Sequence, residues 1–158
     1  MNELTVIGRA EKANFPQITR RKVPVKIDTG ADACSIWAHV TELRNGKLHV
    51  IFFGEESEYY TGEEHIFDKH EYTVTRVANS FGHRELRYKV KLKITVKRRT
   101  INGSFTLSNR ATKLYPVLIG RSLLRNKFLV DVSKGNPLSE QERARAEKLK
   151  AELEGKTI

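Results

Sequence analysis

The sequence has little cysteine and tryptophan and no long apolar run. Its 158 residues include one cysteine, Cys34, which cannot form a disulfide within the chain. No segment approaches the roughly 18 consecutive apolar residues of a membrane-spanning helix. The first residues also lack the cationic and apolar stretches of a secretion signal. These absences exclude a disulfide scaffold and an integral membrane protein, and we expect a cytoplasmic protein in a reducing compartment.

Positive charge, by contrast, is in excess. The chain has 29 lysine and arginine residues against 19 aspartate and glutamate residues, a net charge of +10. Residues 54–71 contain seven acidic side chains and one lysine, whereas residues 84–127 contain thirteen basic side chains and one acidic one. Such a basic region attracts nucleic acid, an anionic membrane surface or an acidic peptide, and charge alone does not choose between them.

Alternation of apolar and polar residues dominates the pattern. It is clearest in Leu86–Val96, which predicts a long, half-buried strand. Shorter strands are predicted at Leu4–Ile7, Val23–Ile27, Leu48–Phe53, Tyr72–Val77, Ile101–Leu107, Leu114–Ile119 and Phe128–Val132. Asn45-Gly46 and Asn102-Gly103 are turn signals, and Arg121–Asn126 has room for one short helix. Residues 1–135 are therefore expected to form one mainly β domain.

The composition changes after Gly135-Asn136-Pro137. Ser139, with Glu142 three residues later, predicts a capping box ahead of a helix over Arg143–Leu153. Apolar side chains are few in this segment, so the helix either packs one narrow stripe on the body or frays. We expect residues 136–158 to form a charged, helical C-terminal tail.

The strand Val23–Ile27 runs directly into Asp28-Thr29-Gly30. A rigidly held carboxylate needs such a turn, because glycine allows close backbone approach and threonine can lock the loop by hydrogen bonds. Three-residue matches also arise by chance, and an aspartate that ends a strand and caps a turn explains this one as well. A second segment, Leu118-Ile119-Gly120, repeats the pattern of an apolar strand that ends in glycine.

Together these two segments resemble the retropepsins, the dimeric aspartic peptidases of retroviral type. In that family the apolar-apolar-glycine element lies beside the Asp-Thr-Gly loop of each subunit. The match extends to Ala31-Asp32 and to Arg121, Leu123 and Leu124. The resemblance implies a closed β-barrel subunit of the acid-protease type.

A narrower resemblance covers most of residues 3–133. Three further motifs carry it: Val6-Ile7-Gly8-Arg9, Ser80-Phe81-Gly82-His83-Arg84-Glu85-Leu86-Arg87 and Thr106-Leu107-Ser108-Asn109-Arg110. They look like the bacterial and archaeal retropepsin-like family often labelled ATP-dependent zinc proteases, commonly associated with ATP-grasp ligases that add glutamate to a ribosomal protein. The resemblance implies a peptidase of that pathway. The chain departs from the family at Ala111, usually an acid, and at Asp32, commonly an arginine.

No cofactor or metal is expected. The five histidines include no His-Glu-x-x-His motif, and a single cysteine cannot build a thiolate site. The nearest cluster, Glu63–His70, needs a favourable loop or helix for its ligands to converge. A phosphate-binding Gly-x-x-x-x-Gly-Lys-Ser/Thr loop is also absent from the sequence, so the chain itself is not expected to hydrolyse ATP.

Aspartic peptidase chemistry requires two carboxylates that share one proton. The chain supplies one such motif, so we expect a homodimer that places Asp28 of each subunit on the twofold axis. The expected catalytic segment is Asp28, Thr29 and Gly30, supported by Ala31, Asp32, Gly120 and Arg121. The resemblance implies an ion pair between Asp32 and Arg121, and an exposed, unpaired Asp32 is the alternative.

A peptidase also needs a flap over its cleft. The hairpin formed by Tyr72–Val77 and Leu86–Val96 is the candidate, with its tip at Ala78–Gly82. The candidate flap or substrate residues are Asn79, Ser80, Phe81, Gly82, His83 and Glu85. Arg87, Lys89, Lys91 and Lys93 form a cationic stripe, which is either a solvated face or a surface that attracts acidic peptides such as glutamate tails.

The competing function is a non-catalytic, basic binding module for RNA, the ribosome or a protein partner on the same fold. Single-stranded nucleic acid stacks on aromatic side chains, and the cationic stripe contains little aromatic interleaving. The sequence therefore favours a peptide or protein substrate over nucleic acid.

Overall fold

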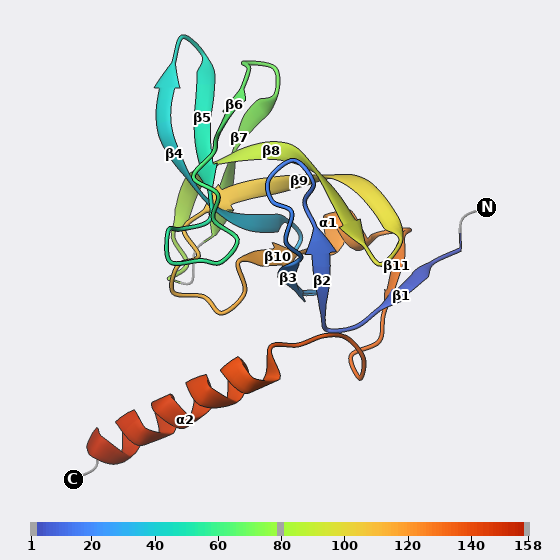
Figure 1. The fold of residues 1–158 in the computed structure, drawn as a ribbon, viewed down its shortest axis with the longest axis vertical. Coiled ribbons are helices and arrows are strands. Elements are labelled where there is room, and N and C mark those ends of the chain that lie inside the picture. Colours follow the sequence, from blue (N-terminus) through green and yellow to red (C-terminus); the bar gives the residue numbers. More distant parts are fainter. Residues whose placement is uncertain (1–2, 79–80, 157–158) are drawn as a thin grey trace.

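The computed structural model describes residues 3–78 and 81–156 and consists of a β-barrel, a side sheet and a projecting helix (Figure 1). The strands are β1 (Thr5–Ile7), β2 (Ala10–Asn14), β3 (Val23–Ile27), β4 (Cys34–Arg44), β5 (Lys47–Phe52), β6 (Glu64–Phe67), β7 (Tyr72–Ala78), β8 (Arg84–Val96), β9 (Arg99–Ser108), β10 (Val117–Ile119) and β11 (Phe128–Val130). The helices are α1 (Arg121–Leu124) and α2 (Ser139–Lys156).

Six of the strands close into a barrel. Their order is β10-β3-β2-β8-β9-β4, and β10 also pairs with β4, which joins the two ends of the sheet. The alternating apolar residues of these strands fill the interior, where Val25, Ile36, Ile94 and Phe105 are each fully buried. Closure leaves β10 hydrogen-bonded on both sides. The expected closed, mainly β barrel is confirmed.

A second set of strands extends from the barrel. β4 continues beyond it and pairs with β5, which in turn pairs with β6. Asn45 and Gly46 join β4 to β5 with φ angles of 52° and 76°, the left-handed conformation that this dipeptide favours in tight hairpins. The first of the two predicted turns is therefore confirmed.

The second predicted turn is wrong. Asn102 and Gly103 lie inside β9, and the chain reverses instead near Lys97, which has a φ angle of 57°. A Cβ atom on Gly103 would lie 2.7 Å from Cδ1 of Leu123 in α1. This glycine therefore allows the short helix to pack closely on β9 and does not form a turn.

The N- and C-terminal parts of the barrel chain form a small parallel sheet. β1 pairs with β11 from Thr5↔Phe128 to Ile7↔Val130. Apolar side chains on and directly before this sheet remain exposed: Leu4, before β1, by 42%, Val6 by 45% and Leu129 by 53%. The sheet thus presents an unpartnered apolar surface beside the barrel.

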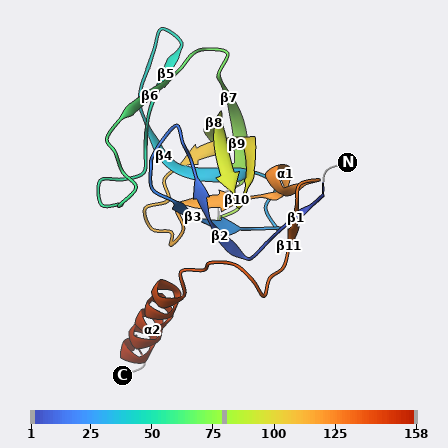
Figure 2. The ribbon, with the colours of Figure 1, turned by 45° about the vertical axis from the view of Figure 1, so that its right-hand side comes forward.

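Helix α2 projects from the barrel in both views (Figures 1 and 2). It starts four residues before and ends three residues after the predicted Arg143–Leu153. The predicted capping box does not form, because the Glu142 N–H donates to the Leu138 carbonyl at 2.8 Å. Instead, both carboxylate oxygens of Glu142 accept hydrogen bonds from Arg9, at 2.9 and 3.1 Å, and Tyr115 donates a third at 2.9 Å. Glu142 therefore attaches α2 to the barrel. Within the described residues, no helix is long and apolar enough to cross a membrane.

Candidate active site

Asp28 lies where β3 leaves the barrel. Its backbone N–H donates to the carbonyl of Ile119 at 2.9 Å, which continues the parallel pairing of β3 with β10. The backbone N–H of Gly30 donates to Oδ1 of Asp28 at 3.0 Å, and the N–H of Ala31 donates to the Asp28 carbonyl at 3.2 Å. The half-buried carboxylate is thus oriented by the turn that follows it.

Gly120 allows the segment after β10 to approach this turn. A Cβ atom at position 120 would lie 2.4 Å from the carbonyl oxygen of Ala33 and 2.8 Å from that of Ala31. The next two residues bind the same turn, because Arg121 N–H donates to Ala31 at 2.8 Å and Ser122 N–H donates to Asp32 at 2.9 Å. The two segments singled out in the sequence therefore lie together.

Arg121 contacts the Asp28 turn with its side chain as well. Its Nη1 donates to the Thr29 carbonyl at 2.9 Å, and its Nη2 lies 4.0 Å from Oδ1 of Asp32. Asp32 has 76% of its side chain exposed, and exposed ion pairs of this length contribute little to stability. The hydrogen bond to Thr29 is therefore the stronger connection between α1 and the turn.

The hairpin expected as a flap is present. β7 pairs with β8 from Tyr72↔Val90 to Ala78↔Arg84. Among the tip residues, Phe81 is 84% exposed and Gly82 has a φ angle of 79°. Asn79 and Ser80, also expected at the tip, lie outside the described residues.

Two further candidate residues lie next to the tip of this hairpin. His83 is exposed at the start of the returning strand. Glu85 accepts contacts of 2.7 Å from both Nε and Nη2 of Arg87. The carboxylate of Glu85 thus neutralises the first cation of the predicted stripe.

Arg110 ends the motif Thr106-Leu107-Ser108-Asn109-Arg110, but the sequence predicted no role for it. Its Nε donates to the Tyr115 carbonyl at 2.9 Å. Burial and repulsion by Arg87 lower the pKa of Arg110 from its usual value, and attraction by Asp28 opposes this shift. The guanidinium of Arg110 therefore interacts electrostatically with both the candidate catalytic carboxylate and the flap.

A hollow of about 430 Å³ separates the flap from the rim of the barrel. Its walls include Arg87 and Tyr88 on β8, and Ser108 and Asn109 at the end of β9. The hydroxyl of Ser108 is hydrogen-bonded to that of Ser35 at 2.7 Å. This hollow is lined by the residue that directly precedes Arg110.

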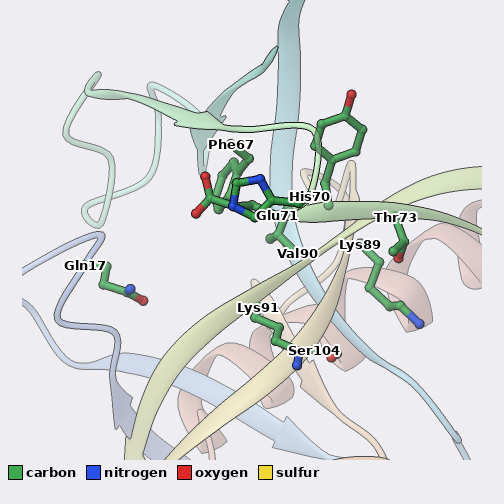
Figure 3. A pocket seen from close by; sticks show the side chains of 10 residues that line it. Gln17, Phe67, His70, Glu71, Thr73, Lys89, Val90, Lys91 and Ser104 are labelled. Carbon is green, nitrogen blue, oxygen red and sulfur yellow. The ribbon is translucent and has the colours of Figure 1, made fainter. Parts of the chain in front are cut away.

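The next lysines of the cationic stripe line a different hollow, of about 570 Å³ (Figure 3). Lys91 and Ser104 face His70 and Glu71 across it, with Lys89 farther along β8. The stripe thus lines two hollows, Arg87 the first and Lys89 and Lys91 the second.

The histidines do not form a zinc site. Nδ1 of His49 contacts Oε1 of Glu64 at 2.5 Å, and this hydrogen bond lowers the pKa of Glu64. The ring of His65 packs edge-on against Phe52, with centroids 5.3 Å apart. In the part of the chain that the structure describes, no three His, Cys, Asp or Glu side chains converge in a way that could hold a metal ion. The residues present therefore do not fit the zinc of the family label.

The closed barrel and its strand-end aspartate beside a glycine-terminated strand define the class of retropepsin-like proteins. The model of the RimB-like family, described as the retropepsin-like aspartic endopeptidase RimB, matches residues 6–138. The chain therefore belongs to the RimB-like family.

Two further comparisons give a sequence relative and a structural neighbour. A probable alpha-L-glutamate ligase of Desulfotalea psychrophila (strain LSv54 / DSM 12343) is 24% identical over 136 residues, which are 80% of this chain and 28% of the relative. The chain thus spans little more than a quarter of that protein. The crystal structure of Lpg0085, a protein of unknown function from Legionella pneumophila subsp. pneumophila str. Philadelphia 1, superposes with a TM-score of 0.63 at 23% identity. That comparison covers 84% of this chain and 97% of the other, and it shows the fold.

Proposed function

We propose that the protein is an aspartic endopeptidase that acts as a homodimer. The observation that carries this proposal is the position of Asp28 in a RimB-like chain: it ends a barrel strand, and its carboxylate is oriented by Gly30. Thr29 and Ala31 complete the turn, and Asp32, Gly120 and Arg121 support it. In the dimer, Asp28 and Asp28 of the partner subunit form the catalytic pair.

The proposed reaction requires one shared proton between the two carboxyl groups. The ionised carboxylate accepts a proton from water, whose oxygen forms a bond to the carbonyl carbon of the peptide. The other carboxyl group donates its proton to the carbonyl oxygen. As the tetrahedral intermediate breaks down, the C–N bond breaks and the amide nitrogen accepts the proton that the first carboxylate took from water. One hydroxyl of the intermediate returns a proton to the other carboxylate, which restores the shared proton.

The apolar surface of the β1–β11 sheet supports the dimer. Val6 and Leu129 lie opposite each other in this parallel pairing and are 45% and 53% exposed. A second copy that covers this surface would remove apolar area from water and stabilise the association. We expect activity per subunit to fall on dilution, and to fall further in Leu129→Glu.

We propose acidic, glutamate-rich peptides as the substrates and the cytoplasm as their place of action. The net charge of +10 and the cationic side chains on β8 support an acidic substrate. The naming of a relative as a probable glutamate ligase supports a place in the same pathway as an ATP-grasp ligase. The separation into a domain of residues 1–135 and a tail of residues 136–158 is likewise part of this proposal.

The decisive test replaces Asp28 by asparagine. The amide is nearly the same size but cannot share the proton or act as a base, so hydrolysis of glutamate-rich peptides should be lost while fold and dimer persist. Asp68→Asn, the same change in the turn between β6 and β7, is the matched control. Residual activity of Asp28→Asn above a few per cent of wild type would overturn the proposal.

The basic region of residues 84–127 favours a second candidate, a non-catalytic binding module for RNA, the ribosome or a protein partner. Salt-sensitive RNA binding that Asp28→Asn leaves unchanged, with no hydrolysis by wild type, would favour this module. Saturable binding of a statine-type transition-state mimic that Asp28→Asn abolishes would favour the peptidase.

A further inference from the structure

We propose that the hollow of about 570 Å³ beside Lys91 binds a small molecule that carries a phosphoryl group on a planar, apolar body. This second hollow lies between the β6–β7 turn and the wall formed by β8 and β9. Its lining residues belong neither to the Asp28 turn nor to the segment after β10. The site is therefore separate from the one that carries the proposed peptidase function.

Hydrogen-bond donors gather on the β8–β9 side of the second hollow. Lys91 on β8 lies opposite Ser104 on β9 in the strand register, and both side chains line the hollow (Figure 3). Oε1 of Gln17 accepts the backbone N–H of Lys93 at 2.8 Å, which holds Gln17 beside the same part of β8 and leaves its amide NH₂ to donate. An ammonium, a hydroxyl and an amide group are therefore available to an acceptor on this side.

The two lysines of the second hollow lack a counter-charge. Lys91 is exposed, Lys89 is half-buried, and within residues 3–78 and 81–156 neither has an ion-pair partner. Glu71 also lines the hollow but lies on the opposite side (Figure 3), and its Oε1 accepts the backbone N–H of Asp68 at 2.9 Å. An anion beside Lys91 would thus gain electrostatic attraction without breaking an existing ion pair.

The types of donor favour a phosphoryl group over a carboxylate. Arginine binds a carboxylate through a planar pair of hydrogen bonds, but the basic side chains that the structure describes around this hollow are lysine and histidine, with no arginine. An ammonium attracts an anion as a point charge. A phosphoryl group has three acceptor oxygens, so Lys91, Ser104 and Gln17 can each donate to a different one.

Aromatic side chains form the other side of the second hollow. Phe67 at the end of β6 and Tyr72 at the start of β7 both line it. The hydroxyl of Tyr72 donates to the Gly46 carbonyl at 2.8 Å, and its ring packs edge-on against Tyr88 with centroids 5.8 Å apart, so this wall is held in place. Phe67 is only half-buried, and a planar body that covers its ring would remove apolar surface from water.

The size and position of the second hollow also fit a small ligand. Its volume of about 570 Å³ lies within the roughly 300–1,000 Å³ of small-molecule sites. Tyr72↔Val90 is the last pair of the β7–β8 hairpin, at the end opposite the tip. A ligand in the hollow would therefore contact both strands where the hairpin joins the barrel.

The test uses phenyl phosphate as the probe and measures its affinity for the full chain by isothermal titration calorimetry. In Lys91→Gln this affinity should fall by about 10- to 100-fold, because a charge-assisted hydrogen bond is lost. Lys93→Gln removes the same charge from the same face of β8, outside the lining, and should keep the affinity of wild type. Absence of saturable binding by wild type, or an equal loss in both variants, would overturn the proposal.

A second pair of variants tests the planar body of the ligand. Wild type should bind inorganic phosphate about 10-fold more weakly than phenyl phosphate, because no ring then covers Phe67. Phe67→Leu should weaken phenyl phosphate several-fold and leave inorganic phosphate unchanged, with an intact circular dichroism spectrum. Phe81→Leu, the same change at the exposed hairpin tip, should alter neither affinity. An unchanged affinity of Phe67→Leu for phenyl phosphate would show that the planar body is wrong.

Two further outcomes would overturn the proposal. Asp28→Asn should bind phenyl phosphate as wild type does, and a loss would mean that the ligand occupies the candidate catalytic site. This measurement involves no turnover, so a failure of the peptidase proposal leaves it unaffected. Displacement of phenyl phosphate by single-stranded RNA, with RNA binding weakened in both Lys91→Gln and Lys93→Gln, would assign the hollow to an extended nucleic-acid surface instead.

Discussion

Two segments at opposite ends of β10, the Asp28 turn and residues 109–116, are held in different ways. The Asp28 turn, residues 28–32, is fixed by backbone hydrogen bonds from β10 and α1, among them Asp28 N–H to Ile119 and Arg121 N–H to Ala31. Segment 109–116 has a backbone hydrogen bond from Trp37 to Pro116, and two side chains of α2, Glu142 and Arg145, also bind it. We therefore expect substitutions on the surface of α2 to affect segment 109–116, whereas the Asp28 turn is fixed by the barrel.

This comparison has a physical basis. Backbone hydrogen bonds in a closed barrel form together with the rest of the sheet and break only when it opens. Side-chain contacts such as that of Arg9 with Glu142 lie on the surface, where 46% and 29% of the two side chains are exposed. Water competes with them, so they contribute less and respond to pH and single substitutions.

The largest expected effect comes from crowding the Asp28 turn. In Gly120→Ala the new Cβ would lie 2.4 Å from the Ala33 carbonyl oxygen, so the backbone must move. We expect a loss of roughly 2–4 kcal/mol of unfolding free energy and most of the activity. Urea denaturation measures the loss of unfolding free energy. Gly155→Ala, with no atom within 4 Å of its Cβ, is the control, and equal stability of the two variants would contradict the comparison.

A smaller effect is expected where α2 contacts segment 109–116. Tyr115→Phe removes the hydroxyl that binds Glu142 and Leu138, and each hydrogen bond contributes about 1 kcal/mol. We expect a loss of about 1–2 kcal/mol by denaturation, together with a raised KM for acidic peptides.

The control for this prediction is Tyr72→Phe. It removes a hydroxyl that donates to the Gly46 carbonyl at 2.8 Å, far from segment 109–116. It should lower stability without raising KM. If both variants raised KM equally, the effect would not come from α2.

A still smaller effect is expected within the Asp28 turn at Ala31. A serine hydroxyl there could donate a hydrogen bond to the ionised catalytic pair, which a methyl group cannot do. Ala31→Ser should therefore move the upper limb of the pH profile of kcat/KM to lower pH, by a few tenths to about one unit. Kinetics of the folded dimer across pH measure this, and an unmoved or raised limb would show that Ala31 does not tune the pair.

The smallest effect concerns the pH dependence of α2 attachment. Hydrogen bonds from Arg9, and then from Tyr115, lower the pKa of Glu142 in the folded protein. Its contribution to stability is therefore complete above about pH 5 and is lost as pH falls through the lowered pKa. The difference in unfolding free energy between wild type and Glu142→Gln should vanish at acid pH. A difference that persists at acid pH would contradict this.

Periodicity predicted most of the barrel strands. β3 occupies the predicted Val23–Ile27, and β8 extends the predicted Leu86–Val96 by two residues. β8 alternates between buried and less buried residues from Val90 onward, which is the pattern that period-two analysis detects. β3 is buried at all residues except Lys26 and was detected as a short apolar run. The helix after Gly120 was also predicted, although it is shorter than expected.

Three strands were missed. β4 is buried on successive residues where it passes through the barrel and exposed beyond it, so its sequence does not alternate. β2 contains alanine, glutamate and lysine, which have low strand propensity, and β6 is only four residues long. In each case hydrogen bonds to neighbouring strands stabilise the strand. The pattern of a single sequence does not show which strands will be neighbours.

By itself, the sequence determined the mainly β body and the loop that carries Asp28, because strand periodicity, a carboxylate and a glycine are local features of the chain; the closed barrel was expected only from the resemblance to the retropepsins. Only the tertiary structure decided the place of Arg110 and the attachment of α2, because both depend on contacts between distant segments. Glu142 illustrates the reason. Its spacing from Ser139 fits a local cap, but Arg9 and Tyr115, 133 and 27 residues away, form its hydrogen bonds instead.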